Sequence, residues 1–255
     1  MNKISVYIIA YNEAEKISDC ISSVSWADEV IVVDSHSNDG TSEIALSMGA
    51  KVKHVEFDGY GKLRNSAINF CSYDWIFSLD ADERCTDSVK NEIMSLINED
   101  KHDIYLIPRK NYFMGKFIKY SGWYPNYRQP QLFRKGLLEY DNLPVHEGYI
   151  SHSNRAIGIL KNAIWQIPFK NYEEMLHKAN RYSTLGVEKL ENKGTEASFY
   201  RAFIHGLWAF FKHYIFKLGV LDGVAGFVIA FANFEGTFYR YLKLLEKKSN
   251  WKIPK

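Results

Sequence analysis

Short apolar runs and helix-like segments alternate through the first part of the chain. Lys3 to Ala10 and Glu29 to Val33 are rich in β-branched residues and predict buried strands, and further strands are predicted over Lys51 to Phe57 and from Trp75. Strands that alternate with helices in short units predict a doubly wound sheet of parallel strands. The first helix is indicated by apolar residues that recur every three or four positions, namely Ile17, Cys20, Ile21 and Val24.

Polar residues stand where three of these strands end. Right-handed crossovers bring the carboxyl ends of parallel strands to one edge of a sheet, where ligands bind in open α/β sheets. We therefore expect a nucleotide to lie across this edge, with Asp34 accepting hydrogen bonds from its ribose or base. A turn or a helix cap is the alternative role for Asp34. The residues expected to contact the nucleotide here are Ala10, Tyr11, Asn12, Glu13, Asp34, Asp80, Ala81 and Asp82.

The strand that starts at Trp75 loses its apolar character abruptly at Asp80. Side chains two apart on an extended chain point the same way, so Asp80 and Asp82 can converge on one point. Two converging carboxylates repel each other unless a cation lies between them. Mg²⁺ or Mn²⁺, held by one or two carboxylates and completed by substrate phosphates, meets that need. A solvated acidic turn is the alternative for this motif.

A basic segment, Lys62 to Asn65, follows two closely spaced glycines. Arg64 is the stronger candidate for a contact with a phosphate or the nucleotide, because a guanidinium matches phosphate geometry. Lys62 is a second candidate, with the solvated start of a helix as its alternative. The chain contains neither Gly-x-Gly-x-x-Gly nor Gly-Lys-Ser/Thr, which argues against a dinucleotide site and a P-loop.

Aromatic residues concentrate between Asn111 and Tyr127, on a segment that contains glycine and proline. Because aromatic side chains commonly line sites for organic ligands, we expect Trp123, with Tyr124 beside it, to hold an acceptor sugar by its apolar face. A position in the core is the alternative for Trp123.

A histidine and a glutamate follow the short apolar piece Leu143 to Val145 and precede Gly148. When a hydroxyl group attacks a sugar it must lose its proton, and Glu147 is our candidate for the base that takes it. His146 is the other candidate, and it could instead bind the metal or the diphosphate. A purely structural pair is the alternative.

The last third of the chain is predicted to be helical, over Glu173 to Asn192, Ala202 to Leu221 and Gly223 to Leu245. Residues 201–255 hold nine lysines and arginines against three acidic residues, a net charge of +6 in a chain whose total is +2. Neither of the last two segments is a convincing membrane span, which needs about 20 apolar residues. Basic helices rich in aromatic residues suit a membrane interface, and packing on the rest of the chain is the alternative.

Cysteine usage and the first strand bear on the compartment. Three cysteines at spacings that match no metal site predict a reduced, cytosolic environment. The apolar run Ile4 to Ala10 is too short for a signal peptide, and polar residues follow it at once. Together with the basic helices, these features predict a cytoplasmic protein, peripheral on the inner face of the cytoplasmic membrane.

These motifs together resemble those of the family 2 inverting glycosyltransferases, through Asn12-Glu13, Val32 to Thr41 and Leu79 to Glu83. The closer resemblance is to the lipopolysaccharide and lipooligosaccharide core β-1,4-glucosyltransferases, and it covers nearly the whole chain. The segments that carry the closer resemblance are Lys62 to Asn65, Gly122 to Pro125, Leu132 to Arg134, Val145 to Glu147 and Asp222 to Phe227.

The resemblance implies a GT-A type fold of the nucleotide-diphospho-sugar transferases, an α/β protein with a Rossmann-like mixed sheet and a C-terminal helical extension. Residues 1–170 would form the catalytic domain that binds the nucleotide sugar, and residues 171–255 a helical region suited to a membrane interface. The implied cofactor is Mg²⁺ or Mn²⁺ at Asp82, with Asp80 near the ribose or the metal. One departure is Gln131, where the family often has arginine; Arg128 could substitute for it at the acceptor.

The expected partners are a UDP-sugar donor, with glucose as the expected sugar, a glycolipid acceptor and an anionic membrane surface, but no nucleic acid. Two other functions are open: a transferase for a capsular polysaccharide or protein acceptor, and a non-catalytic protein that binds nucleotide sugars at a membrane surface. The intact Asp80, Asp82 and Glu147 argue against the non-catalytic alternative. The sequence does not predict the oligomeric state.

Overall fold

The computed structural model describes residues 2–127, 129–141 and 148–249. By its packing the chain divides into two units, Met1–Lys110 with Asn126–Gln166, and Asn111–Pro125 with Ile167–Lys255. The segment Asn111–Pro125, which we expected within the first domain, therefore packs with the C-terminal helices.

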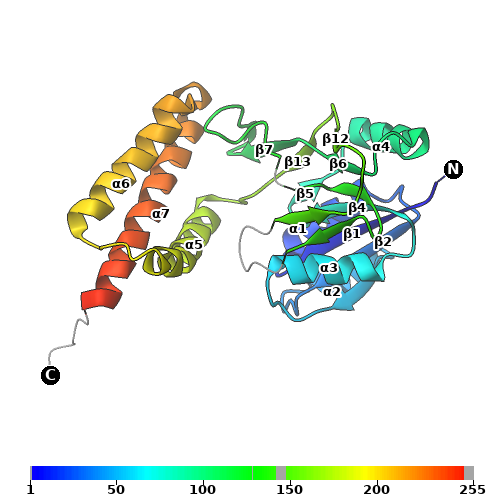
Figure 1. The fold of residues 1–255 in the computed structure, drawn as a ribbon, viewed down its shortest axis with the longest axis horizontal. Helices are drawn as coiled ribbons and strands as arrows, with labels where there is room; N and C mark the ends of the chain where they lie inside the picture. Colours follow the sequence, from blue (N-terminus) through cyan, green and yellow to red (C-terminus); the bar gives the residue numbers. More distant parts are fainter. Residues whose placement is uncertain (1, 128, 142–147, 250–255) are drawn as a thin grey trace. The chain divides into compact units, whose positions relative to one another are not determined.

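The first unit contains a mixed sheet, seven-stranded in the part of the chain that the structure describes (Figure 1). Its strands are β1 (Ile4–Ala10), β2 (Glu29–Asp34), β3 (Lys51–His54), β4 (Trp75–Asp80), β6 (Ile104–Leu106), β9 (Leu132–Arg134) and β12 (Gly158–Ile159). They follow the order β12-β6-β9-β4-β1-β2-β3. The strands β1 to β4 form the parallel part that the alternating pattern predicted, whereas β9 runs antiparallel to both of its neighbours. The expected mixed α/β sheet is confirmed.

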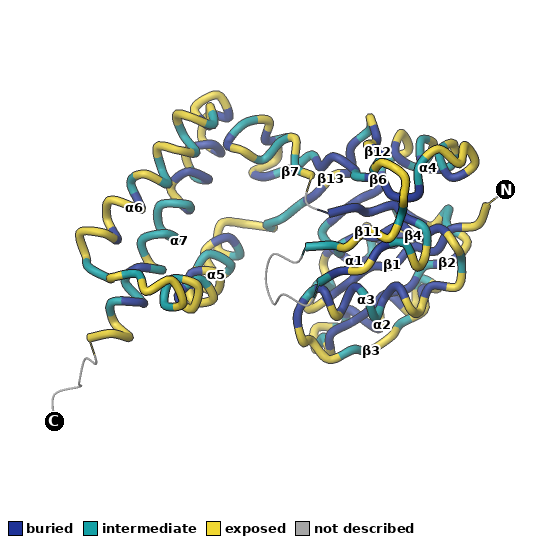
Figure 2. Tube along the Cα trace, viewed as in Figure 1, coloured by how far each residue is buried: buried dark blue, intermediate teal, exposed yellow. Residues whose placement is uncertain are grey.

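Helices cover both faces of this sheet. The helices of the first unit are α1 (Ala14–Ser23), α2 (Thr41–Ser47), α3 (Tyr60–Phe70) and α4 (Asp87–Glu99). Residues of α1, α2 and α4 share one hydrophobic core with the sheet, and residues of α3 share the other. Figure 2 shows β1 and β4 buried between these layers.

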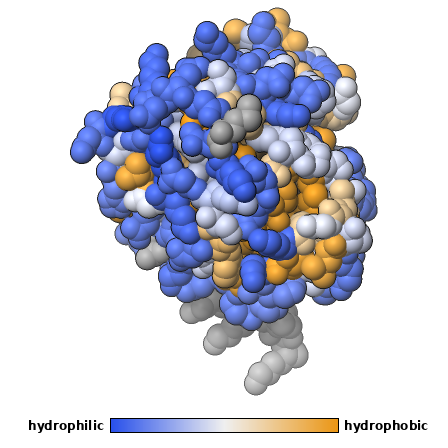
Figure 3. Space-filling view, turned by 90° about the vertical axis from the view of Figure 1, so that its right-hand side faces the viewer, coloured by the Kyte–Doolittle hydropathy of each residue, from blue (hydrophilic) through white to orange (hydrophobic). Residues whose placement is uncertain are grey.

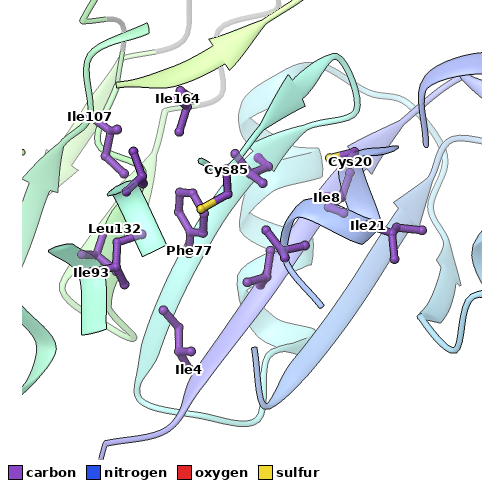
Figure 4. Close-up of a cluster of buried hydrophobic side chains, with 14 of the residues drawn as sticks. Ile4, Ile8, Cys20, Ile21, Phe77, Cys85, Ile93, Ile107, Leu132 and Ile164 are labelled. Atoms are coloured by element: carbon purple, nitrogen blue, oxygen red, sulfur yellow. The ribbon is translucent and has the colours of Figure 1, made fainter. Parts of the chain in front are cut away.

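Strand alternation assigns each side chain of β1 to one of the two cores. Val6 and Ile8 lie in the core with α1, whereas Tyr7 and Ile9 lie in the core with α3. The first of these cores is drawn in Figure 4, where Ile8 lies near Cys20 and Ile21, and Phe77 near Cys85. Burial of these apolar side chains on both faces stabilises the sheet and fixes the strand ends that follow them.

The remaining described strands form two smaller sheets. β10 (Leu138–Tyr140) and β11 (Tyr149–Ser151) form an antiparallel pair, and the connection between them contains residues 142–147. The other small sheet has the order β5-β13-β7-β8, with β5 (Glu83–Arg84), β7 (Arg109–Phe113), β8 (Lys116–Phe117) and β13 (Ile164–Gln166).

The second unit is mainly helical. The helix expected over Ala202 to Leu221 ends earlier than predicted, and two irregular turns follow it. The helical elements are α5 (Tyr172–Asn192), α6 (Phe199–Phe211), the π-helical turn η1 (Lys212–Phe216), the 3₁₀ turn η2 (Gly219–Asp222) and α7 (Val224–Ser249). Among the described residues, no helix is long and apolar enough to cross a membrane.

Figure 3 shows one face of the molecule in a space-filling view. Hydrophilic residues cover most of this face, and hydrophobic residues gather in one area of it.

Candidate active site

The carboxyl ends of β1, β2 and β4 lie side by side. Ala10 pairs with Asp34 across β1 and β2, and Ile9 pairs with Asp80 across β1 and β4. The polar residues that follow these strands therefore meet at one edge of the sheet, as the alternation of strands and helices predicted. Tyr11, the first residue after β1, is exposed there.

Hydrogen bonds join the loop after β1 to the loop after β2. The Glu13 N–H donates to Thr41 Oγ1 at 2.9 Å, and the Ala14 N–H donates to Asp39 Oδ2 at 3.0 Å. Because α1 has no side-chain cap from its own sequence, Asp39 and Thr41 cap it from the neighbouring loop. Burial raises the pKa of Asp39, but hydrogen bonds from the Thr41 hydroxyl and the Ala14 N–H outweigh burial and lower it.

Asp34 is fully buried and already engaged by its own loop. Its carboxylate accepts hydrogen bonds from the Ser37 N–H at 3.1 Å and from Ser42 Oγ at 2.8 Å, and His54 Nδ1 lies 3.5 Å away. Asn12, in turn, donates its N–H to Ser37 Oγ at 2.8 Å. These contacts match the turn role that the sequence allowed for Asp34, and its contact with a ribose or base stays a prediction.

Different partners hold the two carboxylates of the acidic motif. β4 ends at Asp80 and the chain turns directly after it, so the alternation rule for extended chains does not apply to the pair. Asp80 Oδ1 lies 2.7 Å from Arg64 Nη2, a charged partner. The two oxygens of Asp82 accept from Gln166 Nε2, a neutral partner, at 3.2 and 3.3 Å.

A third carboxylate, Glu83, is completely buried beside Asp80. It accepts hydrogen bonds from the Asp80 N–H at 3.0 Å and from Gln131 Nε2 at 2.8 Å, and it pairs with the buried Arg109. Burial raises the pKa of Glu83 to about 7, against the lowering effect of the Arg109 charge. Glu83 therefore positions the backbone of Asp80, and Gln131, the departure from the family pattern, contributes to that contact.

Arg64 and Asn65 connect α3 to β10. Arg64 is almost wholly buried, with Nη1 3.2 Å from Ser78 Oγ and its guanidinium 5.6 Å from the ring of Tyr140. Asn65 bonds both backbone groups of Tyr140, at 2.8 and 2.9 Å. The basic segment thus fixes the strand that leads into residues 142–147.

The structure separates the two basic residues that were predicted to face the nucleotide. Lys62 is exposed and pairs with Asp58 on the preceding loop, which matches the solvated helix start allowed for it. Arg64 lies beside Asp80, where a counter-charge for a diphosphate is expected. A contact between either residue and a nucleotide stays a prediction.

Trp123 and Tyr124 belong to the second unit. Trp123 is partly buried, with ring centroids 6.1 Å from Phe113 and 6.2 Å from Phe169. It also lines a cavity of about 240 Å³ together with residues of α5 and α7. Tyr124 packs edge-on against Phe117 at 5.2 Å. Trp123 thus packs against other aromatic residues and also lines the cavity. Its contact with an acceptor sugar stays a prediction.

Arg128, His146 and Glu147 lie outside the described residues. The last two belong to the connection between β10 and β11, whose ends are joined by the Asp141 N–H donating to the Gly148 carbonyl at 3.1 Å. Their roles as acceptor ligand, second base candidate and base stay predictions.

The donor set suits a divalent cation that phosphates help to bind. Among the described residues, no group of three or more His, Cys, Asp and Glu side chains could hold a metal ion by itself. Mg²⁺, however, usually takes one or two carboxylates and completes its shell with water and substrate phosphates. Asp80, which pairs with Arg64, and Asp82, which accepts from Gln166, are the carboxylates that could contribute to such a shell, and their role as metal ligands stays a prediction.

Three residues that shape the site were not predicted from the sequence. Gln166 and Arg109 lie far along the chain from the acidic motif, and Asp39 acts on a helix that precedes it. Asp39 lies within the Val32 to Thr41 motif, so the sequence marked this residue without giving its role. Arg109 and Gln166 left no signal.

A layered α/β unit whose strand ends present acidic and polar residues, followed by a helical region, defines a glycosyltransferase of the GT-A class. The chain matches the model "Glycosyl transferase family 2" over residues 5–157, and it belongs to this family. The resemblance seen in the motifs is thereby confirmed at the level of the family, and the protein is a transferase.

The similarity to known proteins covers almost the whole chain. An "Uncharacterized glycosyltransferase" of Rickettsia felis is 30% identical over 96% of this chain and 90% of its own. The "Lipopolysaccharide core biosynthesis glycosyltransferase LpsC" of Rhizobium meliloti is 26% identical over 93% of each chain. The crystal structure of S. aureus TarS 1-349 in complex with UDP shares the fold, with a TM-score of 0.51 and 17% identity over 99% of this chain and 93% of that one.

Proposed function

We propose that the protein is a metal-dependent, inverting hexosyltransferase that moves glucose from a UDP-sugar to a glycolipid acceptor of the lipopolysaccharide or lipooligosaccharide core. The observation that carries this proposal is the arrangement at the sheet edge: Asp80 pairs with the buried Arg64, and Asp82 of the same short turn accepts from Gln166. A divalent cation bound at Asp82 would supply positive charge for the diphosphate leaving group.

The chain's own residues divide the remaining tasks. Glu83 holds the backbone of Asp80, and Arg64 holds its side chain, so that the acidic turn is preorganised. Tyr11 and Asp34 stand at the neighbouring strand ends, where the base and ribose are expected. In the reaction, the acceptor oxygen forms a bond to the anomeric carbon, the bond to the diphosphate breaks and UDP leaves. Glu147 takes the proton of the acceptor hydroxyl.

The acceptor class has two supports. The relative LpsC is named as a lipopolysaccharide core biosynthesis glycosyltransferase and aligns over nearly its full length. In addition, the second unit exposes apolar and basic residues that suit a lipid surface. We therefore place the protein in the cytoplasm, peripheral on the inner face of the cytoplasmic membrane. A polysaccharide or protein acceptor would use the same donor site, but it would give no reason for this exposed surface.

A donor and acceptor panel tests the proposal. The purified protein is incubated with several UDP-sugars, with Mg²⁺, Mn²⁺ or excess chelator, and the release of UDP is measured with and without a lipopolysaccharide core acceptor. We expect UDP-glucose to be used, the cation to be required and the core acceptor to raise the rate. Absence of any UDP-sugar binding with either metal would overturn the donor, whereas transfer only to a lipid-free polysaccharide would overturn the acceptor.

A further inference from the structure

The outer face of α6 carries large apolar side chains that no other described element covers. Tyr200, Ile204 and Trp208 recur every four residues and are 72%, 44% and 57% exposed. A spacing of four places them on one side of the helix. The opposite side, with the buried Ala202 and Gly206, faces α7, which lies alongside α6 in Figure 1.

Large apolar side chains are also exposed beyond α6, and the ring of Phe216 on η1 lies 5.5 Å from that of Trp208. Phe216, Leu221 and Val224 are 67%, 61% and 70% exposed. We call these three side chains together with Tyr200, Ile204 and Trp208 the α6–η2 surface. A soluble protein rarely exposes so many large apolar side chains in one short stretch unless they contact a partner.

Tight packing holds the turns in this conformation. The Asp222 carboxylate is buried and accepts from the Tyr120 N–H at 3.1 Å and from Ser121 Oγ at 2.8 Å. A Cβ atom on Gly226 would lie 1.8 Å from the carbonyl oxygen of Gly219, so η2 and α7 are in direct backbone contact. These contacts hold η2 in place, with its apolar residues Val220 and Leu221 exposed.

The charge on this stretch is positive. Between Ala197 and Phe234 the sequence has a single acidic residue, Asp222, and its carboxylate is buried. Arg201, Lys212 and Lys217 lie in the same stretch, and Arg201 pairs with Glu196 directly before it. A second copy of the chain would bring an equally basic surface against it. The combination of apolar and basic side chains instead fits an anionic lipid surface.

We propose that the α6–η2 surface binds the interface of a bilayer that contains anionic phospholipids. Phe216, Leu221 and Val224 enter the upper acyl-chain region, and Tyr200 and Trp208 lie at the level of the headgroups, where aromatic rings are favoured. This inference deepens the proposed function by assigning its membrane partner to one surface, and it rests on that function only for the choice of a membrane as the partner.

The test is flotation of the full-length chain with vesicles of phosphatidylglycerol and phosphatidylcholine, compared with vesicles of phosphatidylcholine alone. The test variant is Phe216→Glu with Leu221→Glu. The matched control is Leu46→Glu, because Leu46 is 58% exposed on α2 in the first unit. We expect the wild type to bind the anionic vesicles and salt to weaken this binding. The double variant should lower the partition coefficient about tenfold or more, and the control should leave it unchanged.

Circular dichroism and UDP calorimetry on the same samples separate this surface from the donor site. Vesicle binding without UDP binding would support the membrane proposal and overturn the proposed function. A folded wild-type protein that does not float overturns the membrane proposal, and so does a double variant that floats as well as the wild type. A dimer in solution that the double variant abolishes would show that the surface joins two copies, which also overturns it.

Discussion

The Nη2 atom of Arg64 lies 2.7 Å from Oδ1 of Asp80, and the guanidinium is buried between α3 and β4. Asp82 of the same short motif accepts hydrogen bonds from Gln166. Arg64 thus brings a buried positive charge to the acidic turn, and Asp82 stays our predicted carboxylate ligand of a divalent cation.

Asp82→Asn is expected to weaken the binding of UDP in the presence of Mn²⁺ to the level that the wild type shows with excess chelator. The amide keeps the shape of the side chain but supplies no charge to a cation, a loss on the order of 3 kcal/mol. Isothermal titration calorimetry measures it, with the exposed Asp87→Asn on α4 as the control. Equal affinity of the wild type with metal and with chelator would refute the metal assignment.

Arg64→Lys is expected to lower the free energy of unfolding by about 1–3 kcal/mol and to weaken UDP-sugar binding about tenfold. A lysine cannot reach Ser78 and Asp80 with one planar fork, so one buried hydrogen bond is lost. Lys62→Met on the same helix is the control, because Lys62 is exposed and pairs only locally in the contacts seen. If Lys62→Met weakens UDP-sugar binding as much as Arg64→Lys does, the prediction that Arg64 is the more important of the two residues for binding is wrong.

Glu147→Gln is expected to leave UDP-sugar binding nearly intact and to lower the rate of transfer by about 10²–10⁴-fold. Glutamine keeps the size and most hydrogen bonds of glutamate but cannot accept the proton of the acceptor hydroxyl. Single-turnover kinetics with saturating donor measure the effect, and Asp141→Asn and His146→Ala are run in parallel. A Glu147→Gln protein that transfers at the wild-type rate, beside an inactive His146→Ala or Asp141→Asn protein, would move the base to that other residue.

Glu29→Gln is expected to lower the free energy of unfolding at neutral pH by about 2 kcal/mol. Burial raises the pKa of Glu29, but hydrogen bonds from Lys51, Ser5 and Ser72 outweigh burial and lower it from 4.5 to about 2. A lowered pKa means that this stabilisation is complete above pH 4.5 and is lost as the pH falls toward 2.

Urea denaturation at several pH values tests the prediction for Glu29. The difference between wild type and Glu29→Gln should shrink steadily below pH 4.5. Glu188→Gln, an exposed change on α5, should show no such dependence. A difference that stays constant down to pH 2 would mean that the charge of Glu29 does not stabilise the fold.

Gly226→Ala and Gly236→Ala, both on α7, are expected to change stability in opposite directions. A Cβ atom at Gly226 would collide with the backbone of Gly219, and the resulting shift should cost about 3 kcal/mol or more. At Gly236 nothing lies within 4 Å, so alanine should stabilise the helix by about 0.5–1 kcal/mol. Thermal unfolding compares the two, and equal effects would contradict the close packing of η2 on α7.

Local patterns in the sequence are enough to predict the strands of the parallel sheet and the polar residues at their ends. Apolar runs such as Ile4–Ala10 indicate strands that are buried on both faces of the sheet. The abrupt change from apolar to acidic residues at Asp80 marks the end of a strand. These signals are local, because strand alternation and helical periodicity are properties of neighbouring residues. The acidic motif, Asp34 and Arg64 are therefore recognisable as candidates from the sequence.

Which side chains contact one another in the site depends on the tertiary fold. Gln166 reaches Asp82, Arg109 pairs with Glu83, and Asp39 caps a helix that precedes it in the chain. Each contact joins residues brought together by the order of the strands, and that order depends on the packing of the whole core. Burial removes water from these polar groups and so changes the free energy of each contact. A local sequence pattern does not indicate this change.

The same limit applies to the second unit. Periodicity predicted one helix over Ala202 to Leu221, but the structure ends α6 at Phe211 and continues with η1 and η2. The change coincides with the backbone contact of Gly219 with Gly226, and with the long-range hydrogen bonds of Asp222 to Tyr120 and Ser121. Local propensity favoured a continuous helix, and the packing of segments about a hundred residues apart in sequence overrode it.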